Sequence, residues 1–179
     1  CYGAENYDAV FIATHTNEAL RMLESPTVEE SNVLGAIPYL QNEAVLHTDT
    51  RLLPKRRLAW AAWNYHILKE QSERVALTYN MNILQGIDAP VSFNVTLNNT
   101  DAIDPSKIIK RVNYEHPLFT PSSVAAQAQH SQLNGSHRTW YCGAYWRNGF
   151  HEDGVVSALD AVAHFNETMH EKLYLRRAS

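Results

Sequence analysis

The sequence contains few cysteines and no long apolar run, and each absence excludes a class of protein. Only Cys1 and Cys142 occur among the 179 residues, too few for the disulfide framework of a small secreted domain. No apolar run reaches the roughly 20 residues that a membrane-spanning helix needs, and no signal-peptide pattern opens the chain. We therefore expect a cytoplasmic protein that has no membrane span.

A strong excess of charge of one sign is also missing. The formal net charge is −4, which gives no reason to expect nucleic acid or an anionic membrane as a partner. The one basic run, at residues 54–57, is typical of a solvated turn. The apolar content of 45% is enough to bury one ordinary hydrophobic core.

Several motifs of known chemistry are absent as well. The nine histidines form no His-Glu-x-x-His or facial-triad spacing, and the chain has no Cys-x-x-Cys, so we expect no metal site. There is no Gly-x-Ser-x-Gly, and Cys142 lies in an apolar run where its thiol is expected to be inert. The seven glycines cannot form Gly-x-Gly-x-x-Gly, the fingerprint that binds a dinucleotide pyrophosphate.

The most informative stretch lies near the C-terminus. A short apolar run ends in Gly143, a loop containing Gly149 follows, and Gly154 lies in the first turn of a helix predicted to reach about Leu173. A helix start offers backbone N–H donors and a positive dipole end, which suit a phosphate or a ring that gains negative charge on reduction. On spacing alone, an ordinary strand–loop–helix turn, with Asp153 countering the helix dipole, is the simpler interpretation.

This stretch resembles the C-terminal flavin-binding motif of the FAD-dependent amine oxidase and phytoene desaturase superfamily. It is most similar to a bacterial branch described as predicted NAD/FAD-binding proteins or flavin-containing amine oxidoreductases. The resemblance covers about residues 7–165, is specific for the family and says nothing of the substrate. The pieces that carry it, in the family's order, are residues 7–15 (YDAVFIATH), 42–49 (NEAVLHTD), 60–65 (WAAWNY), 114–121 (YEHPLFTP), 140–146 (WYCGAYW) and 149–154 (GFHEDG).

The resemblance implies an α+β fragment of a two-domain FAD/NAD(P)-binding oxidoreductase. Residues 1–36 would be the end of the FAD-binding domain, with its final strand and exit helices. Residues 37–137 would form the substrate domain, an antiparallel sheet with helices. Residues 138–179 would supply a return strand, a flavin-contacting loop and the C-terminal helix. The glycine fingerprint of the resembling enzymes precedes this region, so the partner would be the N-terminal dinucleotide-binding half of the same protein, and the fragment alone is expected to be inactive.

FAD is the cofactor that the resemblance implies, with a small molecule as substrate. The backbone N–H groups at residues 151–154 are expected to face the flavin pyrimidine. Ala144 stands where many family members have an acidic residue for the ribityl hydroxyls, so those contacts are expected elsewhere. No catalytic side chain is identified, because hydride transfer to flavin often needs none. The residues expected to contact the cofactor are Ala13, Thr14, His15, Gly143, Ala144, Tyr145, Trp146, Gly149, Phe150, His151, Glu152, Asp153, Gly154 and Val155.

The apolar periodicity predicts the elements that would carry these residues. Runs rich in β-branched and aromatic residues predict an antiparallel sheet, a wholly apolar run predicts a strand buried on both faces, and capping and proline signals predict helices. The predicted antiparallel strands span residues 43–47, 58–63, 75–81, 92–97 and 108–114, the buried strand 10–14, the return strand 138–142, and the helices 16–23, 27–35 and 122–133.

A substrate cavity is predicted on the antiparallel sheet. His47, Trp63, Asn64 and Tyr65 would line it, with the aromatic rings forming a cage or an apolar slot. The alternative is a sheet whose aromatic residues pack the core and whose polar residues face water.

The expected function is hydride transfer from a substrate, such as an amine, to flavin. One alternative is a non-enzymatic α+β module that binds an apolar ligand or a protein. Another is a flavin-dependent desaturase or isomerase that acts on a lipid-like substrate, and nothing in the sequence separates it from an amine oxidase.

Overall fold

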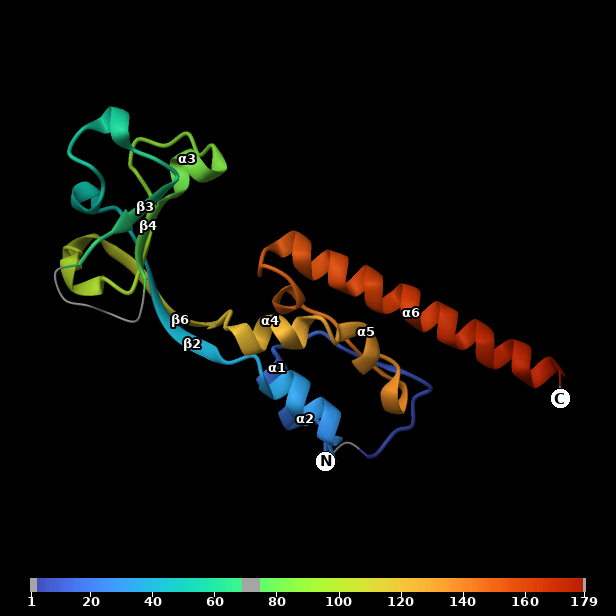
Figure 1. The fold of residues 1–179 in the computed structure, drawn as a ribbon. Coiled ribbons are helices and arrows are strands. Elements are labelled where there is room, and N and C mark those ends of the chain that lie inside the picture. The colour runs from blue at the N-terminus through green and yellow to red at the C-terminus, as the bar shows by residue number, and fades with distance from the viewer. Residues whose placement is uncertain (1–2, 69–74, 179) are drawn as a thin grey trace. The chain divides into compact units, whose positions relative to one another are not determined.

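The chain folds into two compact units, each with its own secondary structure (Figure 1). This computed structural model describes residues 3–68 and 75–178, with side chains up to residue 169. Unit 1 comprises Cys1–Tyr39 and Pro117–Ser179, and unit 2 comprises Leu40–His116. The fold is a mixture of helices and strands, in keeping with the α+β class predicted from the sequence.

Unit 2 is built on a five-stranded antiparallel sheet, as the strand pattern predicted. The strand order is β3-β4-β5-β2-β6, and one short helix, α3 (Met81–Gln85), follows β4 directly. The strands are β2 (Tyr39–His47), β3 (Trp63–His66), β4 (Ala76–Asn80), β5 (Asn94–Leu97) and β6 (Ile108–Pro117).

The predicted strand at residues 58–63 is wrong. Arg57–Ala59 form a turn of 3-10 helix instead, and strand β3 begins only at Trp63. The Trp60 indole N–H donates to the Pro54 carbonyl at 2.8 Å, which folds this segment back on itself before the strand starts. The alternation of alanine and tryptophan therefore reflects a local turn rather than the two faces of a sheet.

Unit 1 contains a two-stranded parallel sheet made of β1 (Val10–Ile12) and β7 (Thr139–Tyr141). The pairing continues past both strands, where the Cys142 N–H donates to the Ile12 carbonyl at 3.0 Å. Because the strands are parallel, both carboxyl ends lie at one edge. Burial of β1 on both faces was wrong for its first two residues, which are more than 40% exposed. Among the described elements only β7 makes extensive contact with β1, so β1 lacks the helices that cover both faces of a strand in a large parallel sheet.

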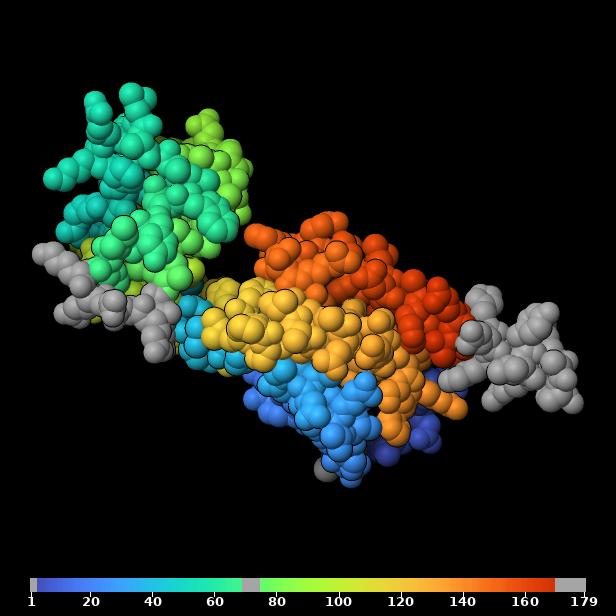
Figure 2. Space-filling view, viewed as in Figure 1, coloured from blue at the N-terminus to red at the C-terminus, as the bar shows by residue number. Residues whose placement is uncertain are grey.

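Helices of unit 1 pack against β7 and against one another. The capping box predicted at residues 27–30 is present, with the Thr27 N–H donating to Glu30 Oε2 at 2.7 Å and the Glu30 N–H donating to Thr27 Oγ1 at 3.0 Å. The helix predicted at residues 122–133 is split into two. Figure 2 shows α2 and α4 packed together. The helices of unit 1 are α1 (Thr16–Met22), α2 (Val28–Gly35), α4 (Pro121–Gln127), α5 (His130–Leu133) and α6 (His151–Ala178).

The core of unit 1 lies between these helices and β7. Tyr141 is fully buried, and its hydroxyl donates to Glu30 Oε1 at 2.7 Å, so the capping glutamate of α2 also anchors the strand. The two units group residues 117–137 with the first 39 residues, whereas the sequence-based division placed them with the sheet. Within the described residues, no helix combines the length and apolar character needed to cross a bilayer.

Candidate functional site

The parallel pairing of β1 and β7 brings together the two segments predicted to bind the cofactor. Ala13 and Thr14 follow β1, and Gly143 follows β7 at the same edge. Ala13 is exposed and Thr14 is half-buried, with its hydroxyl donating to the His15 carbonyl at 3.2 Å. Ligands of α/β folds bind at the carboxyl ends of parallel strands. The fold therefore joins segments that lie far apart in the sequence into one candidate site.

Ser157 fixes the start of α6 against the end of β7. It is 1% exposed, its Oγ accepts from the Gly143 N–H at 2.8 Å, and its hydroxyl donates to the Gly154 carbonyl at 2.9 Å. Sequence analysis did not identify Ser157, because a single serine in a helix is usually exposed and nothing local indicates that it lies against a strand end.

The loop between β7 and α6 is closed by two side chains. Asp153 Oδ2 accepts from the N–H groups of Asn148 at 3.2 Å and Phe150 at 2.9 Å. The Gln127 amide donates to the carbonyls of Tyr145 at 2.8 Å and Arg147 at 2.6 Å. Asp153 therefore holds the loop shut, beyond its predicted role in countering the helix dipole.

Two of the three glycines of the motif, Gly143 and Gly149, are required by the packing and conformation of the chain itself. A Cβ at Gly143 would lie 2.2 Å from the Tyr145 ring, and Gly149 has a φ of +89°, which L side chains rarely adopt. A Cβ at Gly154 would lie 3.7 Å from the Ala144 nitrogen, an ordinary contact distance. Gly143 and Gly149 alone are therefore not a sign of a ligand.

Backbone donors remain open at the start of α6. The first four N–H groups of a helix have no partner within the helix. Here the first, that of Phe150, donates to Asp153, and the N–H of Gly154 begins the helical ladder. For the three between them, at residues 151–153, no acceptor lies among the described residues. Phe150, His151 and Glu152 are exposed, so these donors form a positively polarised end.

Two predicted contact residues lie in the core instead. The side chains of Tyr145 and Trp146 are 3% and 5% exposed, and burial raises the pKa of the Tyr145 hydroxyl. The Trp146 ring stacks on His130 with centroids 4.3 Å apart, and its Nε1 finds no hydrogen-bond partner in the described part of the chain. These residues can offer a cofactor little beyond their backbone groups.

The remaining predicted contacts flank this site. The His15 ring stacks on Tyr39 with centroids 4.5 Å apart, and the His15 N–H donates to Glu18 Oε2 at 3.2 Å. Val155 is 54% exposed on the first turn of α6. Cys142 is buried, and that burial raises the pKa of its thiol, which keeps it protonated at neutral pH.

In unit 2, the four residues predicted to line a substrate cavity do not share one surface. His47 is fully buried, and burial lowers the pKa of its imidazole. Trp63 and Tyr65 are more than half exposed, on the outer face of β3. The buried Asn64 amide donates to the carbonyls of Ala61 at 2.8 Å and Thr78 at 3.2 Å, so its role is structural.

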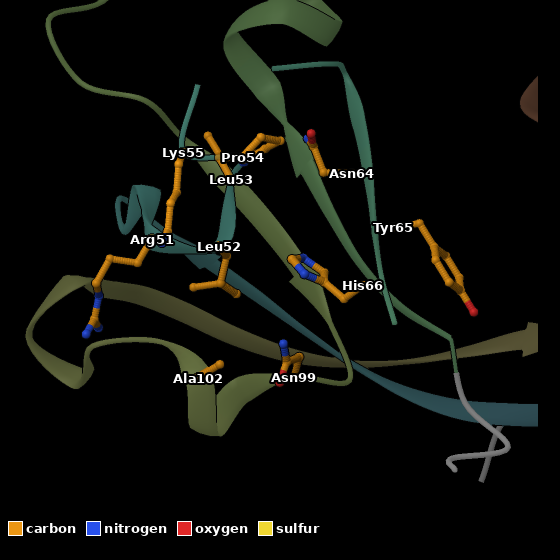
Figure 3. A pocket seen from close by; sticks show the side chains of 10 residues that line it. All are labelled: Arg51, Leu52, Leu53, Pro54, Lys55, Asn64, Tyr65, His66, Asn99 and Ala102. Atoms are coloured by element: carbon orange, nitrogen blue, oxygen red, sulfur yellow. The ribbon is translucent and has the colours of Figure 1, made fainter. Parts of the chain in front are cut away.

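A pocket of about 500 Å³ opens on this unit (Figure 3). It includes Asn64 and Tyr65 from the predicted set, whereas His47 and Trp63 lie elsewhere. The residues that line it are Arg51, Leu52, Leu53, Pro54, Lys55, Asn64, Tyr65, His66, Asn99 and Ala102.

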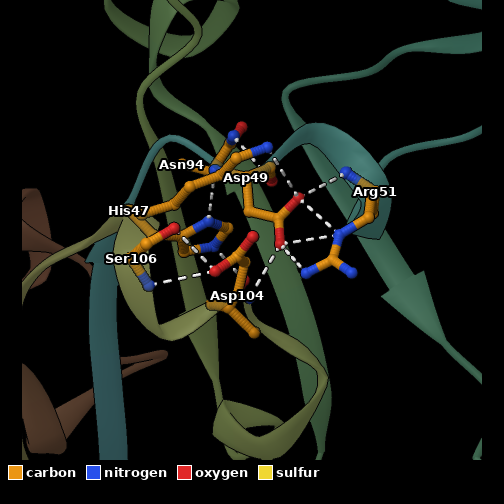
Figure 4. Close-up of polar contacts among 8 residues, drawn as sticks. His47, Asp49, Arg51, Asn94, Asp104 and Ser106 are labelled. Atoms are coloured by element: carbon orange, nitrogen blue, oxygen red, sulfur yellow. Dashed lines mark hydrogen bonds and ion pairs between the residues drawn. The ribbon is translucent and has the colours of Figure 1, made fainter.

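Beside the pocket, Asp49 lies within a cluster of polar contacts (Figure 4). Its side chain is fully buried, and the Arg51 guanidinium binds it through Nε at 3.0 Å and Nη2 at 2.6 Å. The backbone N–H groups of Arg51 and Asp104 donate to it at 3.1 and 2.8 Å. These bonds, the Arg51 guanidinium first, hold the pKa of Asp49 well below its usual range.

No model of a protein family matches the chain, and no curated protein matches it. Among the described residues, no group of three or more His, Cys, Asp or Glu side chains is placed to hold a metal ion. Functional inference therefore rests on the geometry of the two units and on the motif resemblance.

Proposed function

We propose that unit 1 binds the isoalloxazine end of FAD, and that the protein is an FAD-dependent oxidoreductase similar to the amine oxidases. The observation that carries this proposal is the shared edge of β1 and β7, where residues 13–15 meet the strand end at Gly143 and the start of α6. Both segments were expected to contact FAD from the sequence, and they are neighbours in the fold.

The open donors at residues 151–153 suit the pyrimidine edge of the ring. Bound FAD would supply the hydride acceptor, and the helix start would stabilise the negative charge that the ring gains. Ser157 and Asp153 would hold those donors in place, because they fix the helix start and the preceding loop. A helix end held in this way needs little reorganisation during the reaction.

The proposed contacts of this chain are with the flavin end of FAD only. No Gly-x-Gly-x-x-Gly can be formed from the seven glycines of the sequence, so this chain lacks the usual cradle for the pyrophosphate. The proposal therefore assigns the adenosine and pyrophosphate contacts to an N-terminal dinucleotide-binding half of the same protein. The substrate would be a small molecule, and an amine and an unsaturated carbon skeleton fit the proposal equally.

A second candidate is a non-enzymatic binding module. It is favoured by the glycine geometry, because the Tyr145 ring fills the space beside Gly143 and the φ of Gly149 is +89°. Under this alternative the strand–loop–helix motif serves folding alone.

Gly154→Ala separates the two candidates. The added methyl meets only ordinary contacts, and alanine is favoured over glycine in a helix by up to about 1 kcal/mol, so the free energy of unfolding should stay the same or rise. The methyl would nevertheless cover the Ala144 nitrogen at the candidate site. We expect the variant of the natural full-length protein to retain less FAD after purification than the parent.

Gly35→Ala is the matched control, because Gly35 ends helix α2 and a Cβ there would meet only Leu20 Cδ1, at 4.0 Å. It should leave FAD content unchanged. Equal FAD content in the parent, Gly154→Ala and Gly35→Ala proteins would contradict a flavin site at the start of α6.

A further inference from the structure

We propose that the pocket of unit 2 binds a small molecule bearing an oxyanion, either a carboxylate or a phosphate. This inference is independent of the flavin proposal, because it uses residues of unit 2 alone. Four features support it: walls held by a buried carboxylate, a hydrogen-bonded row of side chains that ends at the pocket, a donor presented by that row, and a lining with cations but no carboxylate.

Asp49 fixes two walls of the pocket. Its carboxylate accepts from the backbone N–H of Arg51, in the turn that continues into the lining residues Leu52 and Leu53. It also accepts from the N–H of Asp104 at 2.8 Å, two residues after the lining residue Ala102. Since this carboxylate is fully buried, both walls are held without a ligand, which lowers the ordering cost of binding.

A row of polar side chains crosses four strands and ends at the pocket. His47 Nε2 lies 2.7 Å from Thr96 Oγ1, Thr96 Oγ1 lies 2.8 Å from Thr78 Oγ1, and Thr78 Oγ1 lies 2.8 Å from His66 Nε2. The row thus runs from β2 through β5 and β4 to β3. Its inner three members are fully buried, and His66 lines the pocket.

The backbone sets the direction of the first step of this row. The Asp49 N–H donates to His47 Nδ1 at 3.1 Å, so neutral His47 must carry its proton on Nε2 and donate it to Thr96. The Thr96 hydroxyl is then free to donate to Thr78, and the Thr78 hydroxyl to His66 Nε2. With this assignment, each of the three hydrogen bonds in the row has one donor and one acceptor.

The consequence lies at the pocket wall. If His66 Nε2 accepts, the neutral ring carries its proton on Nδ1, and this nitrogen makes no hydrogen bond to any described residue. In this direction the row leaves a neutral imidazole with an unused N–H donor on a residue that lines the pocket. Burial, which lowers the pKa of His66, keeps the ring in this neutral form at physiological pH.

The charged side chains that line the pocket favour a negatively charged ligand. Lys55 and Arg51 contribute cations, and no Asp or Glu is among the lining residues. Arg51 is already paired with Asp49, so Lys55 supplies the available charge; it forms no ion pair within the described part of the chain. An acceptor-rich anion is the ligand that an ammonium group and an imidazole N–H bind best.

The test is an NMR titration of the intact chain with two probes, inorganic phosphate and succinate, at ionic strength held constant with sodium chloride. We expect saturable shifts of the backbone amides at residues 51–53, 55, 66, 99 and 102 with at least one probe. Binding of phosphate alone would identify a phosphate-bearing ligand, and binding of succinate a carboxylate. The absence of saturable shifts with both probes would overturn the proposal.

Two variants distinguish binding in the pocket from attraction of the anion by the net charge of the protein. Lys55→Glu should weaken binding by about tenfold or more, whereas Lys110→Glu makes the same charge change on an exposed residue of β6 outside the lining and should change the affinity far less. Equal losses in the two variants would show that the anion is attracted by net charge alone, and would also overturn the proposal.

His66→Phe tests the donor itself. It removes the imidazole N–H and keeps a ring of similar size, so affinity should fall while the amide spectrum away from the pocket is unchanged. Unaltered affinity in a folded His66→Phe protein would show that His66 does not contact the anion. The polar row would then give the proposal no support. FAD content plays no part in these readouts, so either proposal can fail without the other.

Discussion

A single buried carboxylate organises the loops beside the sheet of unit 2. Asp49 accepts hydrogen bonds from its own following turn and from the N–H of Asp104. One charged side chain therefore holds two loops. The Arg51 side chain, which is 62% exposed, pairs with this carboxylate from the solvent side. Hydrogen bonds to a charged group contribute more to stability than those between neutral groups.

Asp49→Asn should therefore lower the free energy of unfolding by about 2–3 kcal/mol. The amide keeps the size of the side chain, but its NH2 group would face a backbone N–H that has lost its acceptor. Urea unfolding followed by tryptophan fluorescence measures this change. Asp88→Asn, the same substitution at an exposed position of unit 2, should stay within about 0.5 kcal/mol of the parent. Equal effects of the two substitutions would contradict the role of Asp49.

The same residue predicts a dependence of stability on pH. The pKa of Asp49 in the folded chain lies below its unfolded value of about 3.9. A carboxylate of this kind contributes stability above its unfolded pKa and loses it as the pH falls. The free energy of unfolding of the parent should fall from about pH 5 downward, and Asp49→Asn should flatten that slope. Urea unfolding of both proteins at a series of pH values gives the two slopes, and identical slopes would exclude Asp49 as their source.

Sequence reasoning reached part of this residue-level picture. His47 was predicted as a site residue, but the polar row that begins at it was not. Thr78 and Thr96 face each other only because β4 and β5 pair in one register, and nothing in either segment specifies that register. His66 could not be predicted as a site residue, because its place in the row depends on the pairing of strands that are distant in the sequence.

At the scale of elements, the capping signal predicted a helix correctly, whereas strand propensity predicted one strand that does not exist. The capping box of α2 was predicted because Thr27 and Glu30 recognise each other within one helical turn. The false strand at residues 58–63 arose because its aromatic and aliphatic residues satisfy strand propensity, while the Trp60 indole N–H bonds to the Pro54 carbonyl and folds the segment into a turn. Strands β1 and β7 were both predicted, whereas their parallel pairing required the structure.

The strand-to-helix junction gives a prediction at this scale. Gly143→Ala should destabilise the chain by about 1–3 kcal/mol, because its Cβ would lie 2.2 Å from the ring of the buried Tyr145. The free energy of unfolding from urea titration measures the loss. Gly154→Ala serves as the comparison, since its Cβ has ordinary contacts and should cost nothing. Unchanged stability of the Gly143→Ala protein would show that the ring moves aside and that the junction is looser than described.

At the scale of the whole molecule, the two proposals belong to different units. Unit 1 supplies the parallel strand ends and the open helix start, and unit 2 supplies a pocket with walls held by Asp49. The sequence predicted a division into a cofactor-binding part and a sheet, because the strand pattern changes after residue 36. It did not predict which residues near residue 117 return to unit 1, because the contacts of α4 with α2 depend on packing between distant segments.

The central claim is that the edge formed by β1, β7 and α6 belongs to a flavin site. The most direct test is the FAD content of the protein purified from its complete gene, measured by absorbance and by chromatography of the cofactor released on denaturation. The account predicts about one FAD per chain, with a Gly-x-Gly-x-x-Gly encoded ahead of residue 1. A folded protein that releases no flavin, and does not take up added FAD, would contradict the claim and leave the binding-module alternative in its place.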